Sequence, residues 1–135
     1  MSDKRELGER PSFPVASTAF AQLSFPNGAT GATLIDTATL NINGVIEQIE
    51  IEISTFTDGA KTMTINIASA QNANLFNEGS LADATTHLKQ ALSFKNSADA
   101  DFNPALVDGA LTLTGTISGD PGASGGTVDV TIFYR

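Results

Sequence analysis

Residues 45–54 read VIEQIEIEIS, and this stretch decides the fold class. From Gln48 onward every second residue is isoleucine, and the residues between are polar or acidic. Successive side chains of a β-strand point to opposite faces, so the alternation predicts a strand with one buried and one solvated face. We expect the inward set to be Val45, Ile49, Ile51 and Ile53, and the outward set to be Gln48, Glu50 and Glu52.

The same alternation recurs along the chain, in residues 31–42, 61–69, 110–118 and 127–135, and residues 20–25 are a further strand candidate. Between two of these segments stands Asn43-Gly44, a pair that predicts a type I′ hairpin turn. Short, one-sided, regularly spaced strands are typical of a sandwich. We therefore predict an all-β, antiparallel β-sandwich of about seven or eight strands, jelly-roll or immunoglobulin-like.

One segment departs from this pattern. In residues 80–92, SLADATTHLKQAL, three leucines fall at helical spacing, and Ser80 with Asp83 resembles a helix-capping pair. The β-branched pair Thr85-Thr86 argues against a helix. A short helix and an irregular connection both remain open here.

The composition of the chain excludes several classes of site and partner. The chain has 135 residues, enough for one domain, and lacks cysteine, so it can form neither a disulfide nor a thiolate metal site. No apolar run approaches the ~20 residues of a membrane span, and we expect synthesis in a cytoplasm without export by a signal peptide. The net charge of −8 falls on residues 11–135, because charges cancel within residues 1–10. Such a body repels a phosphate backbone, so we expect no nucleic-acid partner.

The first residues differ from the rest. Residues 1–14 are rich in charge, contain two prolines and show no apolar periodicity, which predicts an extended N-terminal arm ahead of a sandwich domain over residues 15–135. We expect the arm to pack against another chain. Its candidate contact residues are Lys4, Arg5, Arg10 and Phe13.

The sequence contains several patterns that resemble catalytic or metal-binding motifs, but each lacks residues that the chemistry requires. Residues 122–126, GASGG, match a nucleophile elbow, but a strand follows and no histidine comes after Ser124. The single histidine, His87, cannot build a zinc site alone, and Glu50 with Glu52 fits a solvated strand face. We therefore expect no enzymatic activity, no cofactor and no catalytic residue.

One segment partly matches a calcium-binding loop. Residues 99–103, DADFN, match the opening of a calcium loop, but the glycine and the bidentate glutamate that should follow are missing. We expect no metal centre, and a looser calcium loop stays open against a polar turn.

The phenylalanines divide into two groups. We expect Phe20, Phe25, Phe56 and Phe94 to fill the core. Phe13 lies in the arm, and Phe133 points to the outer face of the last strand together with Thr131. For Phe133 two interpretations stand side by side: a ring partly covered by a loop, and an anchor for a protein partner.

The C-terminal stretch GALTLTGTISGDPGASGGTVDVTIFYR, residues 109–135, resembles the closing hairpin of small structural proteins of tailed bacteriophages. The preceding residues 97–109 are similar to the loop that those proteins carry before this hairpin. The resemblance covers about forty residues and brings no catalytic residues with it.

What this resemblance implies is a virion component, a capsid decoration (cement) protein on the capsid surface, made in a host bacterium. Such proteins bind the major capsid protein of an assembled head and often form homotrimers. The alternatives are a phage tail or baseplate component, a receptor-binding module for a host glycan, and a sandwich-fold hydrolase.

Overall fold

A computed structural model describes residues 17–70, 73, 75–90 and 105–135. Every strand pairing in this part of the chain is antiparallel. The elements, in chain order, are β1 (Ser17–Phe25), η1 (Gly31–Leu34), β2 (Ile35–Ile53), β3 (Thr62–Ser69), β4 (Phe76–Ala82), β5 (Thr85–Gln90), β6 (Ala105–Ile117) and β7 (Gly126–Tyr134).

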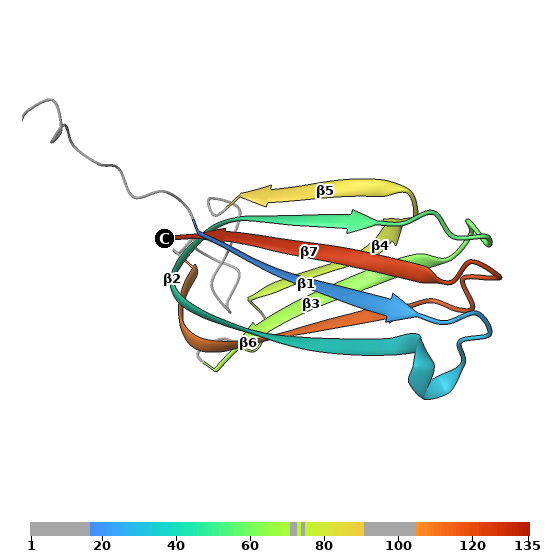
Figure 1. Cartoon of the computed structure of the whole chain (residues 1–135), viewed down its shortest axis with the longest axis horizontal. Coiled ribbons are helices and arrows are strands. Elements are labelled where there is room, and N and C mark those ends of the chain that lie inside the picture. Colours follow the sequence, from blue (N-terminus) through green and yellow to red (C-terminus); the bar gives the residue numbers. More distant parts are fainter. Residues whose placement is uncertain (1–16, 71–72, 74, 91–104) are drawn as a thin grey trace, which may run out of the picture.

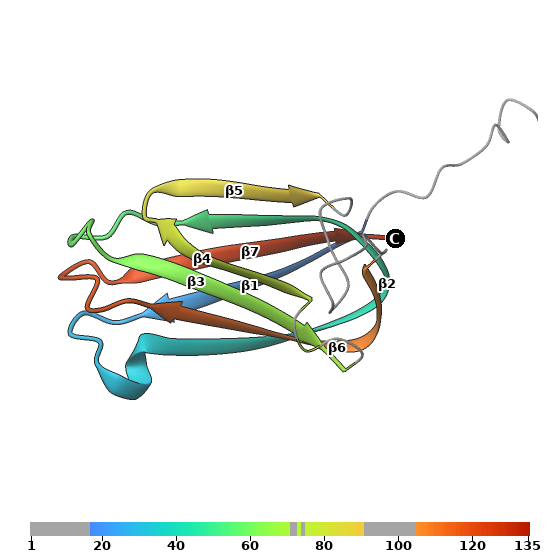
Figure 2. The same cartoon turned by 180° about the vertical axis from the view of Figure 1, so that it is seen from behind.

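The long strand β2 belongs to two layers. Its first half, Ile35–Ile46, pairs with β6, which continues to β3 and β4, whereas its second half, from Ile46 to Ile53, lies between β7 and β5. One layer is therefore β1-β7-β2-β5 and the other is β2-β6-β3-β4. In Figure 1, β7 and β1 cross in front of β3 and β4, and Figure 2 shows the reverse order from behind.

With β2 counted once in each layer, this strand order is that of a jelly roll. An immunoglobulin-like sheet pairs its first two strands, but β1 pairs with the last strand, β7. The predicted all-β sandwich is confirmed, and of the two types expected from the sequence the structure has the jelly roll.

The predicted Asn43-Gly44 hairpin is wrong. β2 continues through both residues, which pair with Asp108 and Val107 of β6. The chain bends here and passes from one layer to the other, as the curve beside the β2 label shows (Figure 1). The pairing partners thus override the local turn preference, and glycine serves a bend between sheets instead of a two-residue loop.

Gly44 also leaves room for the end of the last strand. Val45 and Arg135 exchange two backbone hydrogen bonds, of 2.8 and 3.1 Å. A β-carbon added at Gly44 would lie 2.3 Å from the carbonyl oxygen of Arg135. The Arg135 side chain in turn donates to both carboxylate oxygens of Glu47, at 2.7 and 2.8 Å. These contacts hold β7 against the bend.

The inner faces of the two layers form one apolar core. No buried residue within the described part of the chain is polar or charged. The isoleucines at 49, 51 and 53 are buried as predicted, but Ile46 takes the inward place expected for Val45. A bulge between Ile46 and Gln48 causes this shift, because an extra residue reverses the side on which the preceding side chains point.

Two inward positions without a large apolar side chain have a structural reason. A β-carbon at Gly115 would lie 2.7 Å from Leu23 and 3.2 Å from Phe25, so the missing side chain lets β1 approach β6. Asp36 accepts a hydrogen bond of 2.9 Å from the backbone N–H of Ser24. It thereby connects the edge of β2 to the edge of β1 and links the two layers on one side.

The helix considered for residues 80–92 does not form in the described residues of this segment. β4 ends at Ala82, the chain turns at Asp83 and Ala84, and β5 begins at Thr85. Ala84 has a φ of 55°, a left-handed conformation that serves a tight turn. The β-branched pair at 85–86, which weakened the helical interpretation, opens the strand.

Candidate interaction surfaces

The layer β1-β7-β2-β5 presents an outer surface that we call the acidic face. Alternate residues of its strands point away from the core, as the burial pattern shows. Its members are Thr18, Phe20, Gln22, Ser24, Gln48, Glu50, Glu52, Thr86, Leu88, Thr127, Asp129, Thr131 and Phe133. Three of these are carboxylates, and none of these members is a lysine or an arginine. Arg135, two residues beyond Phe133, forms an ion pair with Glu47.

One row of this face crosses all its strands. Phe20 pairs with Thr131, Thr131 with Glu50, and Glu50 with Leu88. Phe20 is 56% exposed and Leu88 61% exposed, two of the three exposed large apolar residues among those described. Phe133, half-buried, is the diagonal neighbour of Phe20, because it pairs with Thr18. The row therefore has apolar groups at its two ends and a carboxylate between them.

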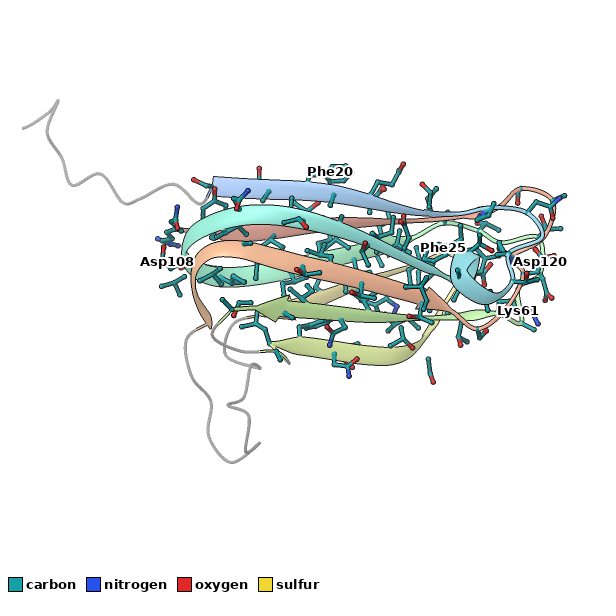
Figure 3. All side chains as sticks on the ribbon, turned by 90° about the horizontal axis from the view of Figure 1, so that it is seen from below. Phe20, Phe25, Lys61, Asp108 and Asp120 are labelled. Carbon is teal, nitrogen blue, oxygen red and sulfur yellow. The ribbon has the colours of Figure 1, made fainter. Side chains whose placement is uncertain are left out.

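The prediction that Phe20 lies in the core is wrong, whereas Phe25 and Phe56 are buried as expected and Phe94 lies outside the described residues. In Figure 3, Phe20 points away from the body and Phe25 lies within it. The sequence carried the signal: Phe20 has the same parity as Gln22 and Ser24, the polar positions of this strand.

The opposite outer surface differs in chemistry, and we call it the threonine face. It covers the outward positions of β2 (first half), β6, β3 and β4. Its members are Ile35, Thr37, Thr39, Asn41, Asn43, Thr62, Thr64, Asn66, Ala68, Asn77, Asp108, Ala110, Thr112, Thr114 and Thr116. Asp108, beside the bend of β2, is the one charged residue among them, and Ile35 is the one large apolar side chain.

The predicted contact residues are only partly described. Lys4, Arg5, Arg10 and Phe13 lie outside the described residues, as does the calcium-loop candidate at 99–103. Phe133 lies on the acidic face, where the sequence predicted it to point outward. The segment with the three basic residues of the arm precedes Ser17, the first residue of β1 at the edge of this same face.

The residues that suggested catalysis lie apart. Ser124 is in the loop before β7, where its hydroxyl is 2.8 Å from that of Thr57. His87 is on the inward side of β5, opposite Ile51, and its Nε2 is 2.8 Å from the hydroxyl of Thr85. A strand, not a helix, follows Ser124. Glu50 and Glu52 point outward on a strand, as expected from the sequence.

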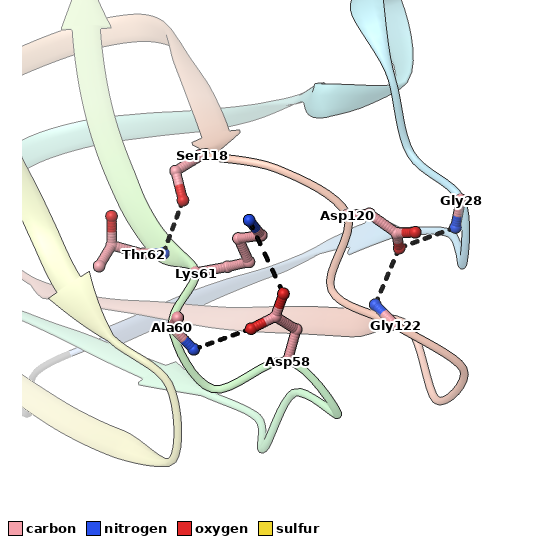
Figure 4. Close-up of polar contacts among 8 residues, drawn as sticks. All are labelled: Gly28, Asp58, Ala60, Lys61, Thr62, Ser118, Asp120 and Gly122. Carbon is pink, nitrogen blue, oxygen red and sulfur yellow. Dashed lines mark hydrogen bonds and ion pairs between the residues drawn. The ribbon is translucent and has the colours of Figure 1, made fainter.

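The β1–β2, β2–β3, β4–β5 and β6–β7 loops meet at one end of the sandwich, which we call the loop end (Figure 4). Oδ1 of Asp120 accepts backbone hydrogen bonds from Gly122 and Gly28, each 2.8 Å long. These two donors, Gly122 first, hold the pKa of Asp120 below its ordinary value because they stabilise the charged carboxylate. One side chain thus joins the β1–β2 loop to the β6–β7 loop.

A second set of contacts joins the remaining loops at this end. Asp58 turns the β2–β3 connection by accepting a 3.1 Å hydrogen bond from the Ala60 N–H, and Lys61 Nζ lies 3.7 Å from its other oxygen. Asp58 and Gly59 lie in the connection from the second half of β2 to β3, two strands that belong to different layers. The backbone N–H of Phe56 donates to Asp83 at 2.9 Å.

Between the loop end and the acidic face is a shallow hollow of about 460 Å³. Glu52 and Asp129, cross-strand neighbours, contribute to its lining, and no aromatic ring does. Asp129 accepts a 2.7 Å hydrogen bond from the amide of Gln22. Within the described ranges no group of three or more His, Cys, Asp or Glu residues is placed to hold a metal ion. Nor does that part of the chain contain a helix long and apolar enough to cross a membrane.

Comparison with known proteins identifies a fold. No family model matches the sequence, and no curated protein does. The structure is similar to a chain of the cyanophage Pam1 capsid asymmetric unit, with a TM-score of 0.55 and 16% identity over 99% of this chain and 98% of that chain. A weaker likeness, with a TM-score of 0.46 and 10% identity, is to the capsid of Ralstonia phage GP4, over 94% of this chain and 91% of that chain. At 16% identity, the likeness to the Pam1 chain shows a similar fold.

Proposed function

We propose that this protein is a virion structural protein of a bacteriophage, and specifically a decoration protein that binds and stabilises an assembled head. The observation that carries the proposal is the similarity to a Pam1 capsid chain, which extends over nearly the whole of both chains. A polypeptide of this fold and about this length is thus part of a phage capsid asymmetric unit. The C-terminal hairpin resemblance is independent support from the sequence.

The geometry agrees with binding to a finished shell. The core is closed within the chain, and neither outer face carries a broad apolar surface of the kind that obligate assembly buries. A protein that folds alone and presents polar faces can be made in the host cytoplasm and added to the capsid surface afterwards. Its partner on the head would be the major capsid protein, and the resemblance of the C-terminal hairpin to phage structural proteins implies a homotrimer.

The catalytic motifs are proposed to be incidental. Ser124 and His87 lie in different elements and have hydroxyl partners, not each other. Replacing either with alanine should leave head stability and attachment unchanged. Specific labelling of Ser124 by a serine-directed covalent probe would overturn this part of the proposal.

The direct test uses heads assembled without the protein. Such heads should form, yet open at a lower temperature or under a gentler osmotic shock than complete heads. Purified protein added back should restore them and saturate at a fixed ratio to the shell subunit, measured by gel densitometry. Failure of the shell to assemble without this protein would make it a primary building block.

The arm is the second element to test. Because β1 begins at Ser17, deletion of residues 2–14 should leave the melting temperature of the body unchanged while attachment to heads weakens. Full-strength attachment of the truncated protein would show that the arm is incidental.

A tail, baseplate or receptor-binding role is the alternative. The hollow beside the loop end is the feature that favours it, but its lining lacks the aromatic ring on which a sugar would stack. Particles that stay intact without the protein, yet no longer adsorb to cells, would establish this alternative in place of decoration.

A further inference from the structure

The two outer faces of the sandwich do not offer a partner the same chemistry. Aromatic residues dominate the energetics of protein interfaces, whereas threonine, serine and leucine are under-represented at energetically important positions. The acidic face has Phe20 and Phe133 as diagonal neighbours and Leu88 in the same row as Phe20. The threonine face has no aromatic residue, and its one charged residue is Asp108, at the end beside the bend of β2.

The negative charge of the acidic face favours a partner with basic side chains. Glu50, Glu52 and Asp129 lie on adjacent strands, and Glu52 is directly opposite Asp129. No ion pair within the described residues joins any of the three to a cation, since Lys61 pairs with Asp58 and Arg135, just beyond β7, pairs with Glu47. Like charges placed opposite each other destabilise a sheet, and a basic partner would relieve this repulsion.

The area of the face limits the size of the interface that it can form. Strand spacing and rise give a four-stranded face at most about 19 Å wide and about 30 Å long, or about 570 Å². A stable interface buries ~800 Å² on each partner. Docking through this face alone would therefore form an interface at the small end of the range for specific complexes.

We propose that the acidic face is the surface by which the protein docks, and that its partner is a shell-protein surface with lysine or arginine side chains around an apolar contact for Phe20 and Leu88. This proposal rests on the function proposed above. The threonine face then points away from the shell. Binding should weaken as salt rises, because part of the attraction is between opposite charges near the surface.

The experiment measures binding of purified variants to heads assembled without the protein, by co-sedimentation at low and high salt. Phe20→Ser removes the exposed ring, and Glu50→Lys reverses the central charge of the row. Thr112→Lys, on the threonine face, is the matched control because it also adds a lysine at an exposed outward strand position. All variants are first checked by circular dichroism and thermal melting.

We expect Phe20→Ser and Glu50→Lys each to weaken binding by about 10-fold or more, with a smaller salt effect for Glu50→Lys, while Thr112→Lys binds within about twofold of wild type. Wild-type binding with no loss in the two acidic-face variants overturns this inference and leaves the decoration function standing. Wild-type protein that does not bind heads overturns both. If Phe20→Ser dissociates an oligomer in analytical ultracentrifugation while head binding persists, the face contacts a second copy, which contradicts the shell assignment.

Discussion

The acidic face and the threonine face belong to the same sandwich but differ in their number of charges and in their aromatic residues. Both are outer surfaces of antiparallel layers, and behind both lie rows of buried isoleucine, leucine and valine. The acidic face has three carboxylates and two phenylalanines, whereas the threonine face has mostly threonine and asparagine, with one carboxylate and no aromatic residue. The difference shows that the fold constrains the inward positions, while the outward positions are free to carry function.

The largest effect is expected where the faces should not differ, in the shared core. Ile51, behind the acidic face, and Ile65, behind the threonine face, are 1% and 0% exposed. Either residue changed to aspartate should unfold the domain, because an unpaired buried carboxylate costs several kcal/mol out of a total stability of ~5–15 kcal/mol. Urea unfolding or loss of soluble expression measures this. A folded Ile65→Asp protein beside an unfolded Ile51→Asp protein would mean that the layers do not share one core.

The next effect concerns the bend at which β2 passes between the two layers. Gly44→Ala should destabilise the protein by about 1–3 kcal/mol, since the added β-carbon would overlap the carbonyl of Arg135. The matched control is Gly109→Ala, at a residue with a φ of 112° but with open space around it. It carries the backbone strain of a positive φ without the overlap. Equal losses in the two variants would show that backbone strain, not the close approach of Arg135, matters at Gly44.

A smaller effect is expected at the loop end, where Asp120 connects the loops of both layers. Its pKa is lowered in the folded state, so its contribution to stability is present above the unfolded value and is lost as pH falls through the folded value. Asp120→Asn lacks this contribution. The difference in urea midpoint between wild type and variant should therefore shrink from about pH 5 to about pH 2. A difference that is constant over this range would contradict the assignment.

The smallest effects on stability are expected on the two outer faces themselves. Glu52→Thr on the acidic face and Thr112→Val on the threonine face should each change the free energy of unfolding by no more than about half a kcal/mol, because both side chains are exposed. Chemical denaturation measures this directly. A loss at Glu52 as large as that at Ile51 would show that the register of this strand is wrong.

Much of the fold could be predicted from the sequence, because period-two alternation is a local signal that core packing reinforces. The strand around residues 45–54, the outward place of Phe133 and the all-β sandwich follow from it. The bulge after Ile46 and the continuation of β2 through Asn43-Gly44 could not be predicted, since both depend on pairing with strands far along the chain.

The candidate surface was less accessible from sequence than the fold. The outward place of Phe133 could be predicted because it has the same parity as Thr131. Phe20 was expected in the core because its side chain is large, although its parity is that of the outward residues of its strand. That Phe20, Glu50 and Leu88 form one row depends on the order β1-β7-β2-β5, which a single sequence does not encode in any local pattern. Long-range register, not residue type, assembles this surface.

The most direct test of the account is an electron cryomicroscopy reconstruction of the native virion. We expect density for this jelly roll on the outside of a closed head, with β1-β7-β2-β5 toward the shell and the threonine face toward solvent. Density for the protein in the tail or baseplate, or as part of the continuous shell wall, would contradict it.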